Sequence, residues 1–146
     1  MIEIVSICHP VYYATSRSAG FDICSNSYVH LLPGERTCVP TGMFITNPKA
    51  NIIERLLSRW FVWELQIRPR SGLAAKYGIT VLNSPGTVDA DYPQEILIIL
   101  HNTSNKEFSC GVGERIAQGV IALVFRARGV LIKQTERTGG GGSTGK

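Results

Sequence analysis

The chain has 146 residues, of which 44% are hydrophobic and 18% are charged. This length and balance fit one globular domain with a sizeable core. The formal net charge is +4, yet the basic residues are spread thinly and form no cluster interleaved with aromatic residues. This distribution argues against a nucleic-acid-binding surface and is compatible with a small anionic ligand, such as a phosphate compound.

Membrane insertion and secretion are also disfavoured. No apolar run approaches the length of about 18 residues that a membrane-spanning helix needs, and the N-terminal residues lack the basic-then-apolar order of a secretion signal. We therefore expect an intracellular protein, of the cytoplasm or nucleus or of viral origin, with no membrane contact. The 4 cysteines form no Cys-x-x-Cys pair and the 3 histidines are isolated. This predicts reduced, mostly buried thiols and no zinc site.

Taken in chain order, short apolar runs separated by turns rich in glycine and proline favour a β-rich fold over a helical bundle. Residues 21–24 alternate, with Phe21 and Ile23 on one side and Asp22 on the other. Segment 49–61 departs from this pattern, because its apolar residues recur at helical spacing, and it predicts a short helix for packing or an interface. The expected strands and apolar runs are 2–7, 21–24, 28–32, 36–39, 42–46, 61–68, 79–82, 96–100, 108–110 and 115–125.

Phosphate-binding groups follow the strand expected at 61–68. Arg70 offers a planar fork of donors and Ser71 a hydroxyl, while the backbone from Ser71 through Gly72 can present N–H groups at a helix start. Gln118 lies within the strand expected at 115–125. Its amide can donate to a phosphate oxygen, although a cross-strand hydrogen bond is the plainer explanation.

Segment 86–95 places two aspartates and a tyrosine between two apolar runs. If its backbone is extended, Asp89 and Asp91 point the same way and Val88 points to the other side. Such a pair could hold a water or a metal, whereas an ordinary hairpin turn is the alternative. The residues of this segment alone leave both interpretations open.

The glycine-rich C-terminal segment is expected to be a flexible flap, residues 136–146, after a single domain of residues 1–135. Four consecutive glycines cannot nucleate a helix or strand. The flap carries the hydroxyl groups of Ser143 and Thr144, which suit closure over an anionic ligand. Plain disorder is the alternative.

Five segments of the chain together resemble, in order and spacing, the five motifs of the trimeric dUTP pyrophosphatases (dUTPases). The resemblance covers nearly the whole chain from residue 19 on and implies an all-β, jelly-roll-like subunit with one short helix. It also implies a homotrimer with shared active sites that hydrolyses dUTP to dUMP and pyrophosphate, with Mg²⁺ carried on the triphosphate. The five segments are 19–22, 69–74, 86–95, 113–118 and 137–145.

The resemblance also implies a role for each site residue. Asp89 would be the general base for the attacking water, and Tyr92 would lie under the deoxyribose and exclude a 2′-hydroxyl. Asn83 and the hairpin backbone that ends at Gly86 would read uracil. Asp22 would reach Mg²⁺ through water, which leaves Asp91 to support the loop. The remaining substrate-binding residues would be Arg70, Ser71, Gly72, Val88, Gln118, Ser143 and Thr144.

The chain departs from the family pattern in its tail and after Tyr92. Glycine, at 140 or 141, stands where the fifth motif usually has an aromatic residue, and Pro93 and Gln94 replace a usual Arg-Gly. We expect weaker flap closure and a raised KM in an active enzyme. The alternative is a catalytically weak member of the fold that acts in nucleotide sensing or protein interaction. A dCTP deaminase is disfavoured, because Asp-x-Asp-Tyr after a uracil-type hairpin fits the pyrophosphatase.

Overall fold

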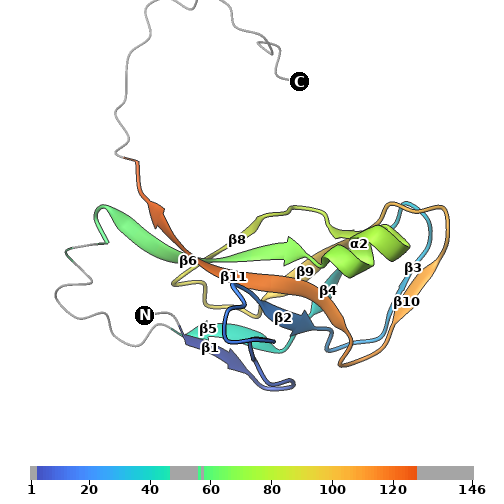
Figure 1. Ribbon diagram of the computed structural model, residues 1–146, viewed down its shortest axis with the longest axis horizontal. Helices are drawn as coiled ribbons and strands as arrows, with labels where there is room; N and C mark the ends of the chain where they lie inside the picture. The colour runs from blue at the N-terminus through green and yellow to red at the C-terminus, as the bar shows by residue number, and fades with distance from the viewer. Residues whose placement is uncertain (1–2, 47–55, 57, 128–146) are drawn as a thin grey trace, which may run out of the picture.

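The computed structural model describes residues 3–46, 56 and 58–127 (Figure 1). The chain is built mostly of strands, and its described helix is α2 (Ser71–Tyr77), which starts where the phosphate-binding segment was expected to begin a helix. The predicted all-β class is confirmed. The strands are β1 (Glu3–Ser6), β2 (Phe21–Cys24), β3 (Val29–Leu31), β4 (Arg36–Pro40), β5 (Met43–Thr46), β6 (Phe61–Pro69), β7 (Ile79–Val81), β8 (Gly86–Asp89), β9 (Leu97–Asn102), β10 (Phe108–Cys110) and β11 (Arg115–Phe125).

The strands of residues 3–46 and 58–127 pair in four antiparallel sheets. The largest has the order β2-β11-β6-β8, the next has the order β4-β9-β7, and the other two are the pairs β1-β5 and β10-β3. In Figure 1, α2 and the β3–β10 pair lie at the right-hand end of the molecule, whereas the start of β6 and the end of β11 lie at the left. Because the two larger sheets hold most of the described strands, they supply most of the scaffold. Among the described residues, no helix is long and apolar enough to cross a membrane.

The core forms where the apolar faces of these sheets meet. Phe21 and Ile23 are 1% and 0% exposed, whereas Asp22 between them is partly exposed, so the alternation expected in this strand is confirmed. Leu65 of β6 and Ile98 of β9 are fully buried in the same cluster. Burying such side chains supplies the main driving force for the fold, at about 25 cal/mol per Å² of apolar surface.

The helix expected at 49–61 lies outside the described residues except at 56 and 58–61. Leu56 is helical, residues 58–60 form a turn, and Phe61 already belongs to β6. The expected end of this helix was therefore too late. The reason is a cross-strand contact. Phe61 pairs with Phe125 of β11, and their rings pack edge to face with centroids 5.9 Å apart.

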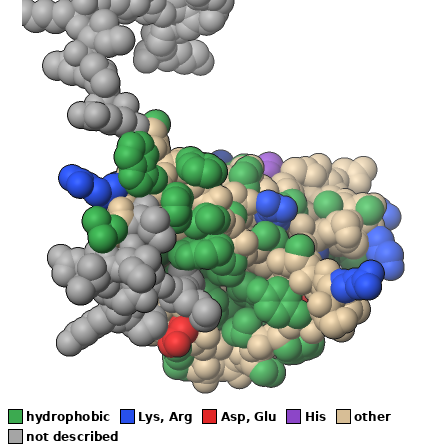
Figure 2. All heavy atoms as spheres, turned by 60° about the vertical axis from the view of Figure 1, so that its left-hand side comes forward, with side chains coloured by type: hydrophobic (Ala, Val, Ile, Leu, Met, Phe, Trp, Pro, Cys, Tyr) green, Lys and Arg blue, Asp and Glu red, His purple; other side chains and the backbone are tan. Residues whose placement is uncertain are grey.

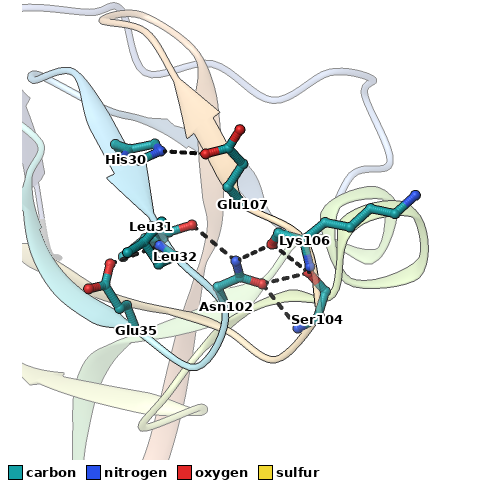
Figure 3. Close-up of polar contacts among 8 residues, drawn as sticks. All are labelled: His30, Leu31, Leu32, Glu35, Asn102, Ser104, Lys106 and Glu107. Carbon is teal, nitrogen blue, oxygen red and sulfur yellow. Dashed lines mark hydrogen bonds and ion pairs between the residues drawn. The ribbon is translucent and has the colours of Figure 1, made fainter.

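A buried asparagine joins three segments at the end of β9 (Figure 3). Asn102 is 0% exposed, and its amide nitrogen donates to the carbonyl oxygens of Leu31 at 3.1 Å and Lys106 at 2.7 Å. Its amide oxygen accepts from the backbone N–H of Ser104 at 3.0 Å and from the Ser104 hydroxyl at 2.8 Å. Both polar atoms of this side chain have hydrogen-bond partners, which offset the cost of burying it. Asn102 thereby ties β9 to β3 and to the loop before β10.

We predict that Asn102→Ala lowers the free energy of unfolding by about 2–3 kcal/mol, because it leaves buried backbone groups without partners. Urea denaturation monitored by circular dichroism would measure the change. The control is Asn105→Ala in the same loop, where the side chain is exposed and the expected change is within about 0.5 kcal/mol. Equal stability of the two variants would contradict this account of Asn102.

Candidate active site

Five of the expected site residues line one small polar pocket of about 140 Å³: Asp22, Arg70, Ser71, Gly72 and Gln118. They come from β2, from the junction of β6 with α2, and from β11. The strand register brings them together, because Gln118 lies directly opposite Asp22 in the β11–β2 pair. Directly opposed side chains share a face of the sheet. We call this cavity the polar pocket.

A glycine makes room for the Gln118 side chain. A Cβ atom on Gly20 would lie 2.7 Å from Cγ of Gln118 and 2.8 Å from its Cδ, closer than real Cβ atoms approach. The glycine before Phe21 in the first motif is thus required by an amide that arrives from β11, far along the chain. This contact joins the first motif to the fourth in space.

Asp22 is held by two arginines. Nε of Arg70 donates to Oδ1 at 3.0 Å and Nη1 of Arg115 donates to Oδ2 at 3.2 Å. Arg115 had no role in the sequence-based assignment. Its position at the start of β11, three residues before Gln118, was visible in the fourth motif, but only the fold shows that it reaches Asp22.

A second cavity, of about 340 Å³, is lined by Asn83, Gly86, Val88, Asp89 and Tyr92. We call it the hairpin pocket. A Cβ atom on Gly86 would lie 3.0 Å from the amide nitrogen of Asn83, so glycine lets this amide pack against the hairpin. Its walls are largely apolar, as is usual for a small-molecule site with a few polar groups. They include Cys38, Ile67, Val81, Ile96, Leu97 and Ile99.

The chain turns immediately after Asp89, which separates the two acids. β8 ends at Asp89, and the backbone N–H of Tyr92 donates to the Asp89 carbonyl at 3.0 Å. The extended backbone that would align Asp89 with Asp91 is therefore absent from this segment, and Asp91 is exposed and does not line the hairpin pocket. Tyr92 is half-buried and borders the cavity beside Asp89.

Glu95 anchors the end of this turn, a role that the sequence did not indicate. Its Oε1 accepts the backbone N–H groups of Thr41 at 3.0 Å and Gly42 at 2.7 Å. The Thr41 hydroxyl in turn donates to the Ile96 carbonyl at 2.7 Å. The segment that carries Asp89 and Tyr92 is consequently tied to the loop before β5.

Within one chain the two pockets are separate. The polar pocket and the hairpin pocket share no lining residue, so the groups expected to bind phosphate and those expected to bind the base do not meet in one cavity of the described residues. Ser143 and Thr144 lie outside the described part of the chain.

The side chains in the described part of the chain offer no direct protein site for a metal ion. Among the described residues, no group of three or more His, Cys, Asp or Glu side chains could hold one. Asp22 shares its carboxylate with two guanidinium groups, which disfavours a cation bound directly to it. Each carboxylate oxygen still has a second lone pair, so Asp22 fits a contact with Mg²⁺ through a metal-bound water.

The four cysteines are free, but they are not mostly buried, contrary to expectation. Cys8 and Cys38 are exposed, whereas Cys110 is buried. Burial, with a smaller contribution from the Glu114 carboxylate, raises the pKa of Cys110 to about 11. Burial and then the nearby Asp22 charge raise the pKa of the Cys24 thiol. Exposed Cys38 and buried Cys110 both lie in short strands, β4 and β10, so the local sequence does not distinguish them.

Comparison with known proteins defines the family. The dUTPase family model matches residues 63–145. The deoxyuridine 5′-triphosphate nucleotidohydrolase of Wolbachia sp. subsp. Brugia malayi is 48% identical over 143 residues, with 92% of this chain and 83% of that protein covered. The chain belongs to the dUTPase family. A family member named deoxyuridine 5′-triphosphate nucleotidohydrolase from Nautilia profundicola is 49% identical over 138 residues, with 92% and 89% covered.

Solved structures show that the dUTPase fold extends to distant sequences. A dUTPase from phage phi11 of S. aureus superposes with a TM-score of 0.74 at 16% identity, over 94% of this chain and 99% of that one. The Staphylococcus bacteriophage 80alpha dUTPase with dUpNHpp superposes with a TM-score of 0.73 at 18% identity, over 99% and 95%. At such low identity the likeness concerns the fold alone, and it agrees with the expected dUTPase subunit.

We predict that a neutral alkylating reagent at pH 8 modifies Cys38 and Cys8 quickly and Cys110 slowly. The thiolate is the reactive form, and a folded pKa of about 11 keeps Cys110 protonated until the pH rises toward that value. Mass spectrometry of digested protein would give the rate at each site, with Cys38→Ser and Cys8→Ser assigning the two fast sites. Fast labelling of Cys110 in the folded protein at pH 8 would contradict the burial described above.

Proposed function

We propose that the chain is a dUTP pyrophosphatase that hydrolyses dUTP to dUMP and pyrophosphate. The observation that carries the proposal is the division of labour between two pockets in a member of the dUTPase family. One pocket has apolar walls, an amide and a carboxylate, and the other gathers phosphate-binding groups. A nucleotide has the same two parts, a flat base with its sugar and a charged phosphate chain.

The hairpin pocket suits the deoxyuridine part of the substrate. Its apolar walls can enclose a planar base, while Asn83 and the hairpin backbone ending at Gly86 supply hydrogen-bonding groups. Cytosine presents the inverted pattern of donors and acceptors, so it would leave a buried group unpaired, at a cost on the order of 1–3 kcal/mol. Tyr92 and Val88 border the same cavity, and we assign the Tyr92 ring to the face of the sugar, where it excludes a 2′-hydroxyl.

Asp89 is the proposed general base. Its carboxylate is exposed at the end of β8 and lines the hairpin pocket, so a water can reach it. The water oxygen attacks the α-phosphorus as its proton passes to Asp89, and the bond from the α-phosphorus to the bridging oxygen breaks to release pyrophosphate. General-base assistance of this kind contributes about 10²–10⁴-fold to a rate.

The polar pocket is the proposed site for the phosphate chain. Arg70 supplies guanidinium donors, Ser71 its hydroxyl and Gln118 its amide, and Gly72 allows the backbone to come close to the ligand. Mg²⁺ bound to the triphosphate would supply charge neutralisation, with Asp22 accepting a hydrogen bond from one of its waters. Ser143 and Thr144 in the C-terminal segment are proposed to close over the phosphates.

A homotrimer with shared sites would bring the two pockets together. One chain keeps them apart, and the β6–β11 pair exposes large apolar side chains that a neighbouring copy could cover. Trp63 is 41% exposed, Leu123 opposite it is 45% exposed and Phe125 is 84% exposed. Figure 2 shows hydrophobic side chains gathered on the side of the molecule where this pair ends. This apolar surface and the divided site support the proposed assembly.

We predict that Asp89→Asn lowers kcat for dUTP by about 10²–10⁴-fold, because the amide cannot take the proton. The Kd of a non-hydrolysable dUTP analogue should stay within about twofold of the wild-type value, because the amide keeps the size of the side chain. Pyrophosphate release measures the first and calorimetry the second. The control is Asp91→Asn in the same turn, which should turn over dUTP normally.

The same assay with dCTP, dTTP and UTP tests the proposed selectivity. Among these nucleotides, wild-type protein should release pyrophosphate efficiently only from dUTP. Absence of dUTP turnover with Mg²⁺ would overturn the enzyme proposal in favour of nucleotide sensing, and a near-normal kcat for Asp89→Asn would overturn its role as the base.

We predict that the protein sediments at three times its chain mass of 16.0 kDa, both with and without the dUTP analogue. Leu123→Lys should shift the distribution toward single chains, because it places a charge on the apolar β6–β11 surface. Leu32→Lys is the matched control, since Leu32 is 46% exposed but lies just after β3, away from the β6–β11 surface. A single-chain mass for the wild type would contradict the trimer.

Mixed assemblies test whether sites are shared. Asp89→Asn chains and Arg70→Ala chains should each be inactive alone. Refolded together, they should regain part of the activity, because some sites would combine an intact Asp89 with an intact Arg70 from another chain. Mixtures that stay inactive while forming trimers would show that each site belongs to one chain.

A further inference from the structure

The carboxylate of Asp22 is shared between two cations. Each of its oxygens accepts from a different arginine, Arg70 at 3.0 Å and Arg115 at 3.2 Å. The Asp22 side chain is 17% exposed, that of Arg70 is 25% exposed and that of Arg115 is 51% exposed. A mostly buried carboxylate therefore lies between two guanidinium groups that would otherwise repel each other.

Arg70 has a second fixed contact. Its Nη1 donates to the backbone carbonyl of Arg115 at 3.1 Å, in addition to the bond from Nε to Asp22. Because the guanidinium group is planar and rigid, contacts made by two of its nitrogens, Nε and Nη1, determine its orientation. Arg70 also lines the polar pocket with Ser71 and Gln118, so its remaining N–H donors are available to a ligand there.

We infer that Asp22 is a positioning residue that acts through Arg70. It orients the guanidinium group for phosphate oxygens before the ligand binds, which avoids the loss of rotamer entropy that ordering a free arginine side chain would incur on binding. The identity of the ligand rests on the proposed function. This role is separate from the water-mediated contact with Mg²⁺, because the bonds to Arg70 and Arg115 need no metal.

Metal-free binding separates the two roles. In Asp22→Asn one acceptor oxygen becomes an NH₂ group that faces a guanidinium donor. We expect the Kd of a non-hydrolysable dUTP analogue to rise by about tenfold or more in EDTA as well as in Mg²⁺. A loss confined to Mg²⁺ would overturn the inference. The control for the lost charge is Glu3→Gln on the exposed edge of β1, which should bind as the wild type does.

A double-mutant cycle tests whether Asp22 acts through Arg70. Lysine lacks the planar fork, so in an Arg70→Lys background the further change Asp22→Asn should have little effect on the Kd. If the two substitutions raise the Kd independently, so that the increase in the double variant is the product of the two single increases, the inference would be overturned. Thermal unfolding of each variant shows whether the fold is retained.

Wild-type protein without ligand provides a test that needs no variant. In NMR spectra, the Nε–H proton of Arg70 should exchange with solvent more slowly than that of Arg17, whose side chain is exposed. Equal, fast exchange would overturn the inference. Failure of the proposed function would look different. In that case dUTP would not be hydrolysed, although the Nε–H proton of Arg70 would still exchange slowly.

Discussion

The candidate site depends first on the register of β11 between β2 and β6. That register places Gln118 opposite Asp22 on one side and opposite Arg68 on the other, and it places Ala117 opposite Pro69, just before Arg70. A slip of one residue would turn every side chain of the strand to the other face. Gln118 would then point into the core, and the polar pocket would not form.

The hairpin pocket depends on hydrogen bonds between distant segments. Glu95 accepts two backbone N–H groups from residues 41–42, and Thr41 donates to the carbonyl of Ile96. These bonds satisfy groups that would be costly to bury unpaired, and they hold the turn that carries Asp89 and Tyr92. The side chains proposed to bind substrate on this turn are thereby held in place by the strands next to it.

Much of the fold was predictable from local patterns, and the reasons are visible in particular residues. Alternation identified β2 and β6, and the Arg-Ser-Gly sequence marked the start of α2. The strands expected at 28–32 and 36–39 are also present, but their partners were not expected: β3 pairs with β10 and β4 pairs with β9. Pairing depends on contacts between residues far apart in the chain, which local periodicity does not encode.

The sequence by itself determined the family, the strand-rich class and the identity of the polar residues, because these follow from residue types and their spacing. Only the tertiary structure decided which of those residues meet. It turned Asp91 away from Asp89, brought Arg115 to Asp22, exposed Cys38 on a pocket wall and kept the two pockets of one chain apart. The physical reason is that strand register and turn geometry, which many distant contacts set together, fix the direction of each side chain.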